Sequence, residues 1–163
     1  MKSKAIQTLV ALTIAIIALP SMSSAQTEPV NVALFDPIQI FPESHSIVGL
    51  RINLIYGKNV SMVGLDWGLV NAVGTGGFTG LQWGFVNICD ANTVGFQGGL
   101  VNLTKNNVEG FQYGWFNSGN HVSGFQLGLV NYAETMKGLQ IGIVNIIKTG
   151  GQFPVFPIVN WSF

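Results

Sequence analysis

The sequence of 163 residues contains little charge, one cysteine and two histidines. Charged residues make up 9% of the chain, against about 25% in an average soluble protein, and seven basic residues balance seven acidic ones. This balance excludes a protein that net charge would steer towards nucleic acid. The single cysteine, Cys89, excludes an internal disulfide. Hydrophobic residues account for 48% of the chain and glycine for 21 positions, so the chain is apolar and glycine-rich.

The N-terminal residues have the organisation of a secretory signal peptide. Lys2 and Lys4 precede the apolar segment Leu9–Leu19, and small residues follow it up to Ala25. The segment is far shorter than the roughly 20 residues that a membrane-spanning helix needs. We therefore expect cleavage after Ala25 and export of the remaining chain. Cleavage removes two of the seven basic residues and leaves five against seven acidic ones, a formal charge of −2.

An octapeptide repeat occupies most of the chain after this segment. Six variants, each beginning with glycine and ending with asparagine, are GLDWGLVN (64–71), GLQWGFVN (80–87), GFQGGLVN (95–102), GFQYGWFN (110–117), GFQLGLVN (124–131) and GLQIGIVN (138–145). Their first glycines are spaced 14–16 residues apart. A degenerate copy begins at Gly49, and a closing copy, FPVFPIVN, ends at Asn160. The sequence thus predicts three parts: a signal peptide (1–25), an N-terminal strand or cap segment (26–48) and a repeat domain of about eight copies (49–163).

Each copy alternates between two kinds of side chain, which is typical of a β-strand. In the copy 110–117, one parity contains Phe111, Tyr113, Trp115 and Asn117. The other parity contains the glycines and the glutamine. Polar segments such as 103–107, 118–121 and 132–135 separate the strands and have the composition of turns. The chain is therefore predicted to be all-β outside the signal peptide.

The even spacing favours a β-solenoid or β-roll, in which each copy lies parallel to the previous one and meets the same environment. Stacking would align the repeated glutamines in one ladder and the repeated asparagines in another, with their amides hydrogen-bonded between copies. The glycines would form corners. We also expect Phe96, Phe111 and Phe125, with the Leu and Val positions, to stack inside a narrow two-sided roll.

An eight-stranded antiparallel outer-membrane β-barrel is the alternative architecture. Eight copies, an apolar parity and the aromatic C-terminus at Phe163 agree with such a barrel. Three features disagree: odd and even connections have similar lengths, Pro154 and Pro157 fall in the strand that would close the barrel, and Trp161 has the parity that would face inward.

The tandem pattern G-[LF]-Q-x-G-[LIFW]-[VF]-N and the closing FPVFPIVNWSF resemble the surface-repeat proteins of Gram-negative bacteria and spirochaetes that are built from GLQLGLVN units. The resemblance covers residues 30–163 and implies export to the envelope or surface. It implies no activity and no site residues. The first copy departs from the pattern, with Arg51, Asn53 and Tyr56 in place of Gln, Gly and Asn, and we interpret it as a cap.

The repeats contain no recognisable catalytic, cofactor-binding or metal-binding set. His45 and His121 are far apart in sequence, and Cys89 has no basic neighbour that would lower the pKa of its thiol. Asp66, Glu109 and Glu134 occupy unrelated positions in their copies, so no carboxylate pair is indicated. We therefore expect a non-enzymatic protein without a cofactor.

Four aromatic residues are the candidates for a contact surface. Trp67, Trp83 and Tyr113 occupy the variable fourth position of the octapeptide, and Trp115 lies two residues further along its copy. If the fourth position faces solvent, these side chains form an exposed aromatic stripe that would contact a sugar, a membrane or a protein. The expected role is structural or contact-mediating, at the outer membrane, the cell surface or in the periplasm. The partner is unidentified, membrane association is one option, and nucleic acid is not expected.

Overall fold

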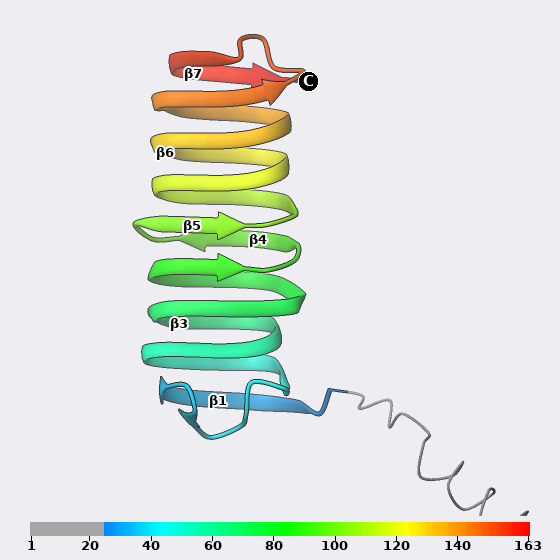
Figure 1. The fold of residues 1–163 in the computed structure, drawn as a ribbon, viewed down its shortest axis with the longest axis vertical. Coiled ribbons are helices and arrows are strands. Elements are labelled where there is room, and N and C mark those ends of the chain that lie inside the picture. Colours follow the sequence, from blue (N-terminus) through cyan, green and yellow to red (C-terminus); the bar gives the residue numbers. More distant parts are fainter. Residues whose placement is uncertain (1–24) are drawn as a thin grey trace, which may run out of the picture.

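The computed structural model describes residues 25–163, which form one continuous stack of β-strands (Figure 1). The predicted signal peptide lies outside the described residues, apart from Ala25. The strands are β1 (Thr27–Phe35), β2 (Ile38–Gln39), β3 (Ser46–Cys89), β4 (Thr93–Gly98), β5 (Val101–Thr104), β6 (Asn107–Thr149) and β7 (Val155–Ser162). No helix of residues 25–163 is long and apolar enough to cross a membrane.

The predicted β-solenoid is confirmed, with about six turns. We call each of the seven octapeptide copies that begin from Gly49 to Gly138, with the residues up to the next copy, a rung. Each rung pairs in parallel with the next at a register of one repeat, so that Gly80 lies beside Gly95 and Gly95 beside Gly110. The barrel alternative is wrong, because neighbouring strands of a barrel of this kind run antiparallel. The polar segments 118–121 and 132–135 do not interrupt the strand, since the corners also hydrogen-bond from rung to rung and β6 continues through them.

The prediction that the glycines form corners is wrong for the glycine that begins each octapeptide, because Gly95 lies inside β4 and pairs with Gly80 and Gly110. The glycine at the fifth position of that copy, Gly99, lies at the corner between β4 and β5. Gly110 has a φ of 135°, a backbone conformation that L side chains rarely adopt. A Cβ atom at this residue would overlap the carbonyl oxygen of Gly95 in the previous rung. The close approach of the backbone in adjacent rungs therefore requires glycine in this column.

The interior of the solenoid contains the polar side chains, and the phenylalanines lie outside. The sixth and seventh octapeptide positions both face outward at the corner between β4 and β5, so the alternation changes parity and both Gln97 and Asn102 point inward. The expectation of an internal phenylalanine stack is wrong. Phe96, Phe111 and Phe125 do stack on one another, with centroids 5.5 and 5.1 Å apart, but they do so half-buried on the outer surface.

The two predicted amide ladders run through the interior. Each glutamine from Gln97 to Gln140 donates to the Oε1 atom of the glutamine in the previous rung, at 2.7–2.8 Å. Each asparagine from Asn71 to Asn131 donates instead to the Oδ1 atom in the following rung, at 2.8 Å. All of these side chains are fully buried, and the two ladders have opposite donor-to-acceptor directions.

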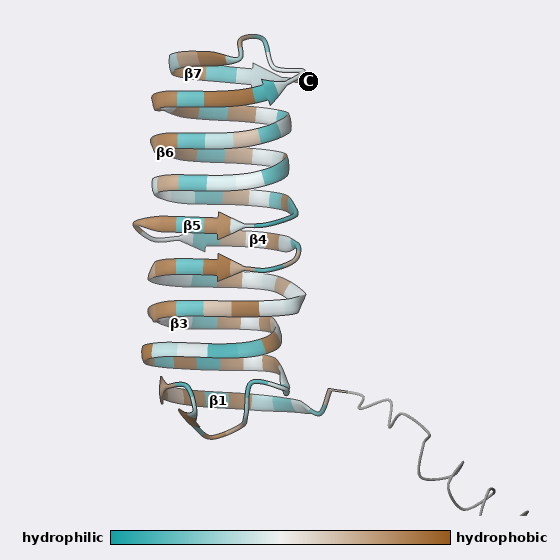
Figure 2. Ribbon diagram, viewed as in Figure 1, coloured by the Kyte–Doolittle hydropathy of each residue, from teal (hydrophilic) through white to brown (hydrophobic). Residues whose placement is uncertain are grey.

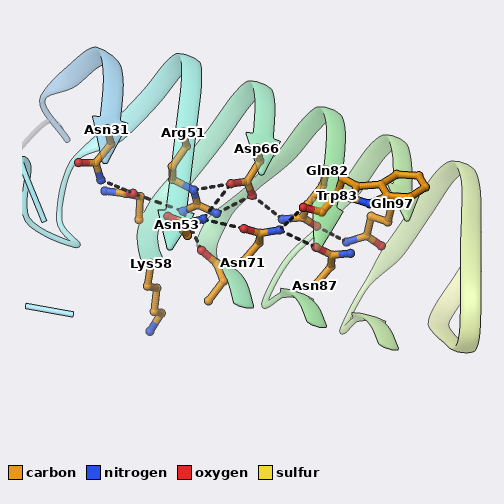
Figure 3. Close-up of polar contacts among 12 residues, drawn as sticks. Asn31, Arg51, Asn53, Lys58, Asp66, Asn71, Gln82, Trp83, Asn87 and Gln97 are labelled. Carbon is orange, nitrogen blue, oxygen red and sulfur yellow. Dashed lines mark hydrogen bonds and ion pairs between the residues drawn. The ribbon is translucent and has the colours of Figure 1, made fainter. Parts of the chain in front are cut away.

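A buried ion pair begins the glutamine ladder (Figure 3). Arg51 and Asp66 occupy the glutamine position in the first two rungs, and their side chains meet at 2.6 and 2.8 Å. Gln82 donates to the second oxygen of Asp66 at 2.7 Å. Arg51 also donates to the carbonyl of Ala72 at 2.9 Å, so the charge is both paired and hydrogen-bonded, as a buried charge requires.

Apolar side chains fill the rest of the interior in two clusters. One contains Ile47, Met62, Val73, Phe78 and Cys89, and the other contains Val108, Val122, Ala133, Met136 and Ile147. Between the clusters, Thr93 and Thr104 share a hydrogen bond of 2.8 Å. Thr104 belongs to the segment predicted as a turn, but it is buried at the end of β5, and the corner begins only after it.

The closing copy is a cap and not an eighth rung. β7 pairs antiparallel with the last rung, where Gly138 lies beside Ser162 and Ile146 beside Val155. The register shifts between Gly142 and Asn145, opposite Pro157. Proline is tolerated at such edge positions, and it prevents a further strand from adding there. At the other end, β1 adds a strand in parallel before the first rung, and β2 pairs with β1.

Candidate functional site

All four predicted contact aromatics face solvent. The exposed fractions are 62% for Trp67, 52% for Trp83, 47% for Tyr113 and 62% for Trp115. The condition on which the contact surface depends, an outward-facing fourth position, is therefore met. These four side chains come from three rungs, because Tyr113 and Trp115 share one copy, and all of them line the same surface groove.

The floor of this groove is the second glycine column of the repeat. A Cβ atom on Gly84 would lie 2.5 Å from Nδ2 of Asn71 and 2.6 Å from the carbonyl oxygen of Gly68. Gly114, two rungs further along, has the same surroundings, with Asn102 and Gly99 as its neighbours. The asparagine ladder thus occupies the space inside the corner, and the column is restricted to glycine.

Large apolar side chains stand on both sides of the glycine floor. Together with the floor they enclose an open groove of about 760 Å³ that runs along the stack, which we call the apolar edge. The fourth octapeptide position supplies one wall, with Ile52, Trp67, Trp83, Tyr113 and Leu127. The sixth position supplies the other, with Leu54, Leu69, Phe85, Leu100, Trp115 and Leu129. Figure 2 shows this corner as the brown margin on the left, where β4 ends and β5 begins.

The wall is lowered in one rung, where Gly98 takes the fourth position. A Cβ atom on Gly98 would lie 2.5 Å from Cε3 of Trp83. The Trp83 ring lies across this glycine and stacks on Phe96, with centroids 5.7 Å apart and an interplanar angle of 16°. The glycine therefore gives the indole a place to lie flat along the stack.

The exposed charges of the repeats lie at the opposite corner. Asp90, Lys105, Glu134 and Lys148 each follow the asparagine of their copy by three residues. They form pairs between adjacent rungs, with Lys105 2.7 Å from Asp90 and Lys148 3.2 Å from Glu134. Hydrogen bonds from Tyr132 and Lys148 lower the pKa of Glu134, which favours its charged form. We call it the charged edge.

The remaining charges of residues 49–163 follow the same division. Lys58, Glu109 and Lys137 also lie between one octapeptide and the next, and the only charged side chains within an octapeptide, Arg51 and Asp66, are buried. The solenoid is therefore amphipathic across its width, with the apolar edge on one side and the charged edge on the other.

The sequence prediction identified one wall of the groove and only Trp115 of the other. The signal for Leu69, Phe85 and Leu129 was present, because the sixth position has the same outward parity as the fourth and is always large and apolar. A leucine at an outward position carries no functional signal by itself, because exposed apolar side chains are common on protein surfaces.

The other reactive groups do not converge. Cys89 is buried, and burial raises the pKa of its thiol, which disfavours the reactive thiolate. His45 lies against Glu28 near the N-terminal end, at 3.4 Å, whereas His121 contacts Thr135 at 2.6 Å. Among residues 25–163, no group of three or more His, Cys, Asp or Glu side chains could hold a metal ion.

Comparison with known protein families, with characterised proteins and with solved structures gave no match to this chain.

Proposed function

We propose that the protein is exported and acts at the cell envelope or surface as a non-enzymatic β-solenoid that mediates contact through its apolar edge. The observation that carries the proposal is the separation of the two edges. An uncharged aromatic groove extends over successive rungs, while the exposed charges of the repeats lie at the other corner. Exposed apolar patches that are larger than usual and bordered by polar residues mark contact sites.

Two features of the sequence support export. Residues 1–25 have the three regions of a signal peptide, and the tandem octapeptide resembles that of bacterial surface-repeat proteins. The fold also suits an extracytoplasmic protein without disulfides, because the buried ladders tie every rung to its neighbours by side-chain hydrogen bonds.

Cell fractionation tests this proposal with two matched variants. Phe85→Lys places one positive charge on the apolar edge, and Asn106→Lys places the same charge at the charged edge, where Asn106 is exposed. We expect the wild type and Asn106→Lys in the envelope fraction, with Phe85→Lys released into the soluble extracytoplasmic fraction. Mass spectrometry of the wild type should show an N-terminus that begins at Gln26.

An unprocessed chain that remains in the cytoplasm would contradict export. Equal retention of Phe85→Lys and the wild type in the envelope would contradict the role of the apolar edge.

A further inference from the structure

We propose that the apolar edge inserts into the hydrocarbon of one leaflet of a lipid bilayer, with the long axis of the solenoid lying along the membrane surface. The inference rests on the proposed envelope role and names the partner of the same edge, a lipid surface. Four observations carry it: the absence of charge in the groove, the type of its polar groups, its direction and the position of the charged edge.

The lining of the groove is suited to hydrocarbon. It contains no ionisable side chain except the Tyr113 phenol, and its floor is mostly glycine backbone. The one amide that lines it, Asn53, directs its side-chain nitrogen into the stack, where it donates to Asn71 at 2.7 Å and to Asp66 at 3.1 Å. A charged or strongly polar ligand would therefore find no matching group in the groove.

The polar groups that remain are those of an interfacial aromatic belt. The side chains of Trp67, Trp83, Trp115 and Tyr113 are 47–62% exposed and carry three indole N–H groups and one hydroxyl to the surface. Tryptophan and tyrosine collect at membrane–water interfaces because the ring is apolar and its polar group can reach the headgroups or water. The apolar edge presents three of the four tryptophans of the chain in this way.

A lipid surface fits these groups better than a second copy of the chain does. If two apolar edges packed against each other, the three indole N–H groups would be enclosed mostly between Leu, Ile, Phe and Trp side chains, and the Tyr113 hydroxyl would be the one side-chain acceptor of the walls. Buried donors without acceptors are unfavourable. At a bilayer surface the same donors stay within reach of phosphate and ester oxygens.

The direction of the groove sets how the molecule would lie. The walls extend from Leu54 in the first rung to Leu129 in the sixth, which is about 24 Å at the usual spacing of about 4.8 Å between neighbouring strands. Because the groove is parallel to the stack, insertion along its length lays the solenoid flat. The charged edge, with Asp90 and Lys105, then stays on the side away from the lipid and in water.

This arrangement predicts binding that does not require anionic lipid. The apolar edge supplies no basic residue, so electrostatic attraction to a negative surface contributes little. Partition into neutral phosphatidylcholine vesicles should therefore match partition into vesicles with anionic lipid, and it should persist in high salt.

Vesicle flotation of the processed chain, purified from the exporting cells, is the direct test. With phosphatidylcholine vesicles we expect the wild type and Asn106→Lys to float equally. Phe85→Lys should partition less by about tenfold or more, because a lysine is expensive to hold in hydrocarbon. The circular dichroism of all three should agree, since both substituted side chains are exposed.

Single-tryptophan variants give a second measurement that does not depend on a charge substitution. Phenylalanine replaces the other tryptophans, which leaves either Trp83 on the apolar edge or Trp161 on the cap, where it packs edge-on against Phe153. We expect lipids with brominated acyl chains to quench Trp83 strongly and Trp161 weakly.

Failure of the wild type to float, or equal quenching of the two tryptophans, would overturn the lipid proposal. A dimer that Phe85→Lys dissociates, without flotation of either protein, would assign the apolar edge to a second copy and would also overturn it. In both cases the envelope role could still stand, because the cell fractionation tests it independently with the whole envelope as partner.

Discussion

Asn102 shows how much of the stack depends on one buried side chain. Its Nδ2 atom donates to Asn117 at 2.8 Å and to the carbonyl of Tyr113 at 2.9 Å, and its Oδ1 atom accepts from Asn87 at 2.8 Å. The side chain therefore joins three successive rungs and also holds the backbone at a wall of the apolar edge.

We expect Asn102→Leu to lower the free energy of unfolding strongly. Leucine would leave a donor on Asn87 and an acceptor on Asn117 unpaired, at about 1–3 kcal/mol for each group. Urea unfolding followed by circular dichroism measures the change. Asn106→Leu is the matched control, since Asn106 lies in an exposed corner four residues further on. If the two variants unfold at the same urea concentration, the ladder contributes nothing to stability.

At this scale the sequence predicted the ladders but not the positions of the phenylalanines. Gln97 and Asn102 recur at fixed spacing, and stacking alone brings such residues together. The side on which Phe96 lies depends on how many residues turn the corner between the two ladders. Two consecutive outward residues at this corner, Leu100 and Val101, reverse the alternation of inward and outward side chains. No local property of these two residues predicts the reversal.

β7 shows how a strand can end a stack instead of extending it. It runs antiparallel to the last rung, contains Pro157 at a register shift and places Ile158 at a φ of 69°. Asn160 is fully buried and binds both the backbone N–H and the carbonyl of Phe153. Of the two prolines that argue against a closed barrel, Pro157 is thus explained by its position in an edge strand, and Pro154 lies just before that strand.

Removal of residues 154–163 should convert the last rung into an open edge. The strand around Ile141 would then expose unpaired N–H and C=O groups, which promote edge-to-edge association. We expect light scattering and size-exclusion chromatography to show high-mass species. Removal of Phe163 alone, which is 91% exposed, serves as the control and should leave a monodisperse protein. A monodisperse protein without β7 would show that the strand has no protective role.

The whole molecule behaves as a stack of similar units, in which each rung contacts only its neighbours. Deletion of residues 110–123 removes one repeat and would bring Gln126 beside Gln97 and Asn131 beside Asn102. We expect the fold to survive with a moderately lower free energy of unfolding. Small-angle X-ray scattering should report a particle shorter by about 4.8 Å.

Deletion of residues 110–116 is the control for this experiment. It removes half a repeat, so that Asn117 loses its register with Asn102 and both ladders are broken. We expect this chain to unfold or aggregate. Equal stability of the two shortened chains would show that register between rungs does not determine the fold.

The sequence could predict the exposed aromatic residues of the candidate site, but it could not predict the groove that they line. The sequence identified Trp67, Trp83, Tyr113 and Trp115 as a possible surface. The groove also requires the second glycine column, and its cause is the asparagine ladder behind it. That relation joins residues in different rungs, such as Gly84 and Asn71, and it becomes visible only when the rungs are stacked.

The opposite directions of the two ladders have an electrical consequence. A column of amides that all point one way adds its dipoles, as the peptide groups of a helix do, and leaves partial charges at its ends. Here the glutamine column and the asparagine column lie side by side and point in opposite senses, so their moments largely cancel. Each added rung can therefore strengthen both columns by mutual polarisation without increasing the charge at either end of the molecule. A lengthened stack would be no more strongly polarised along its axis than the present one.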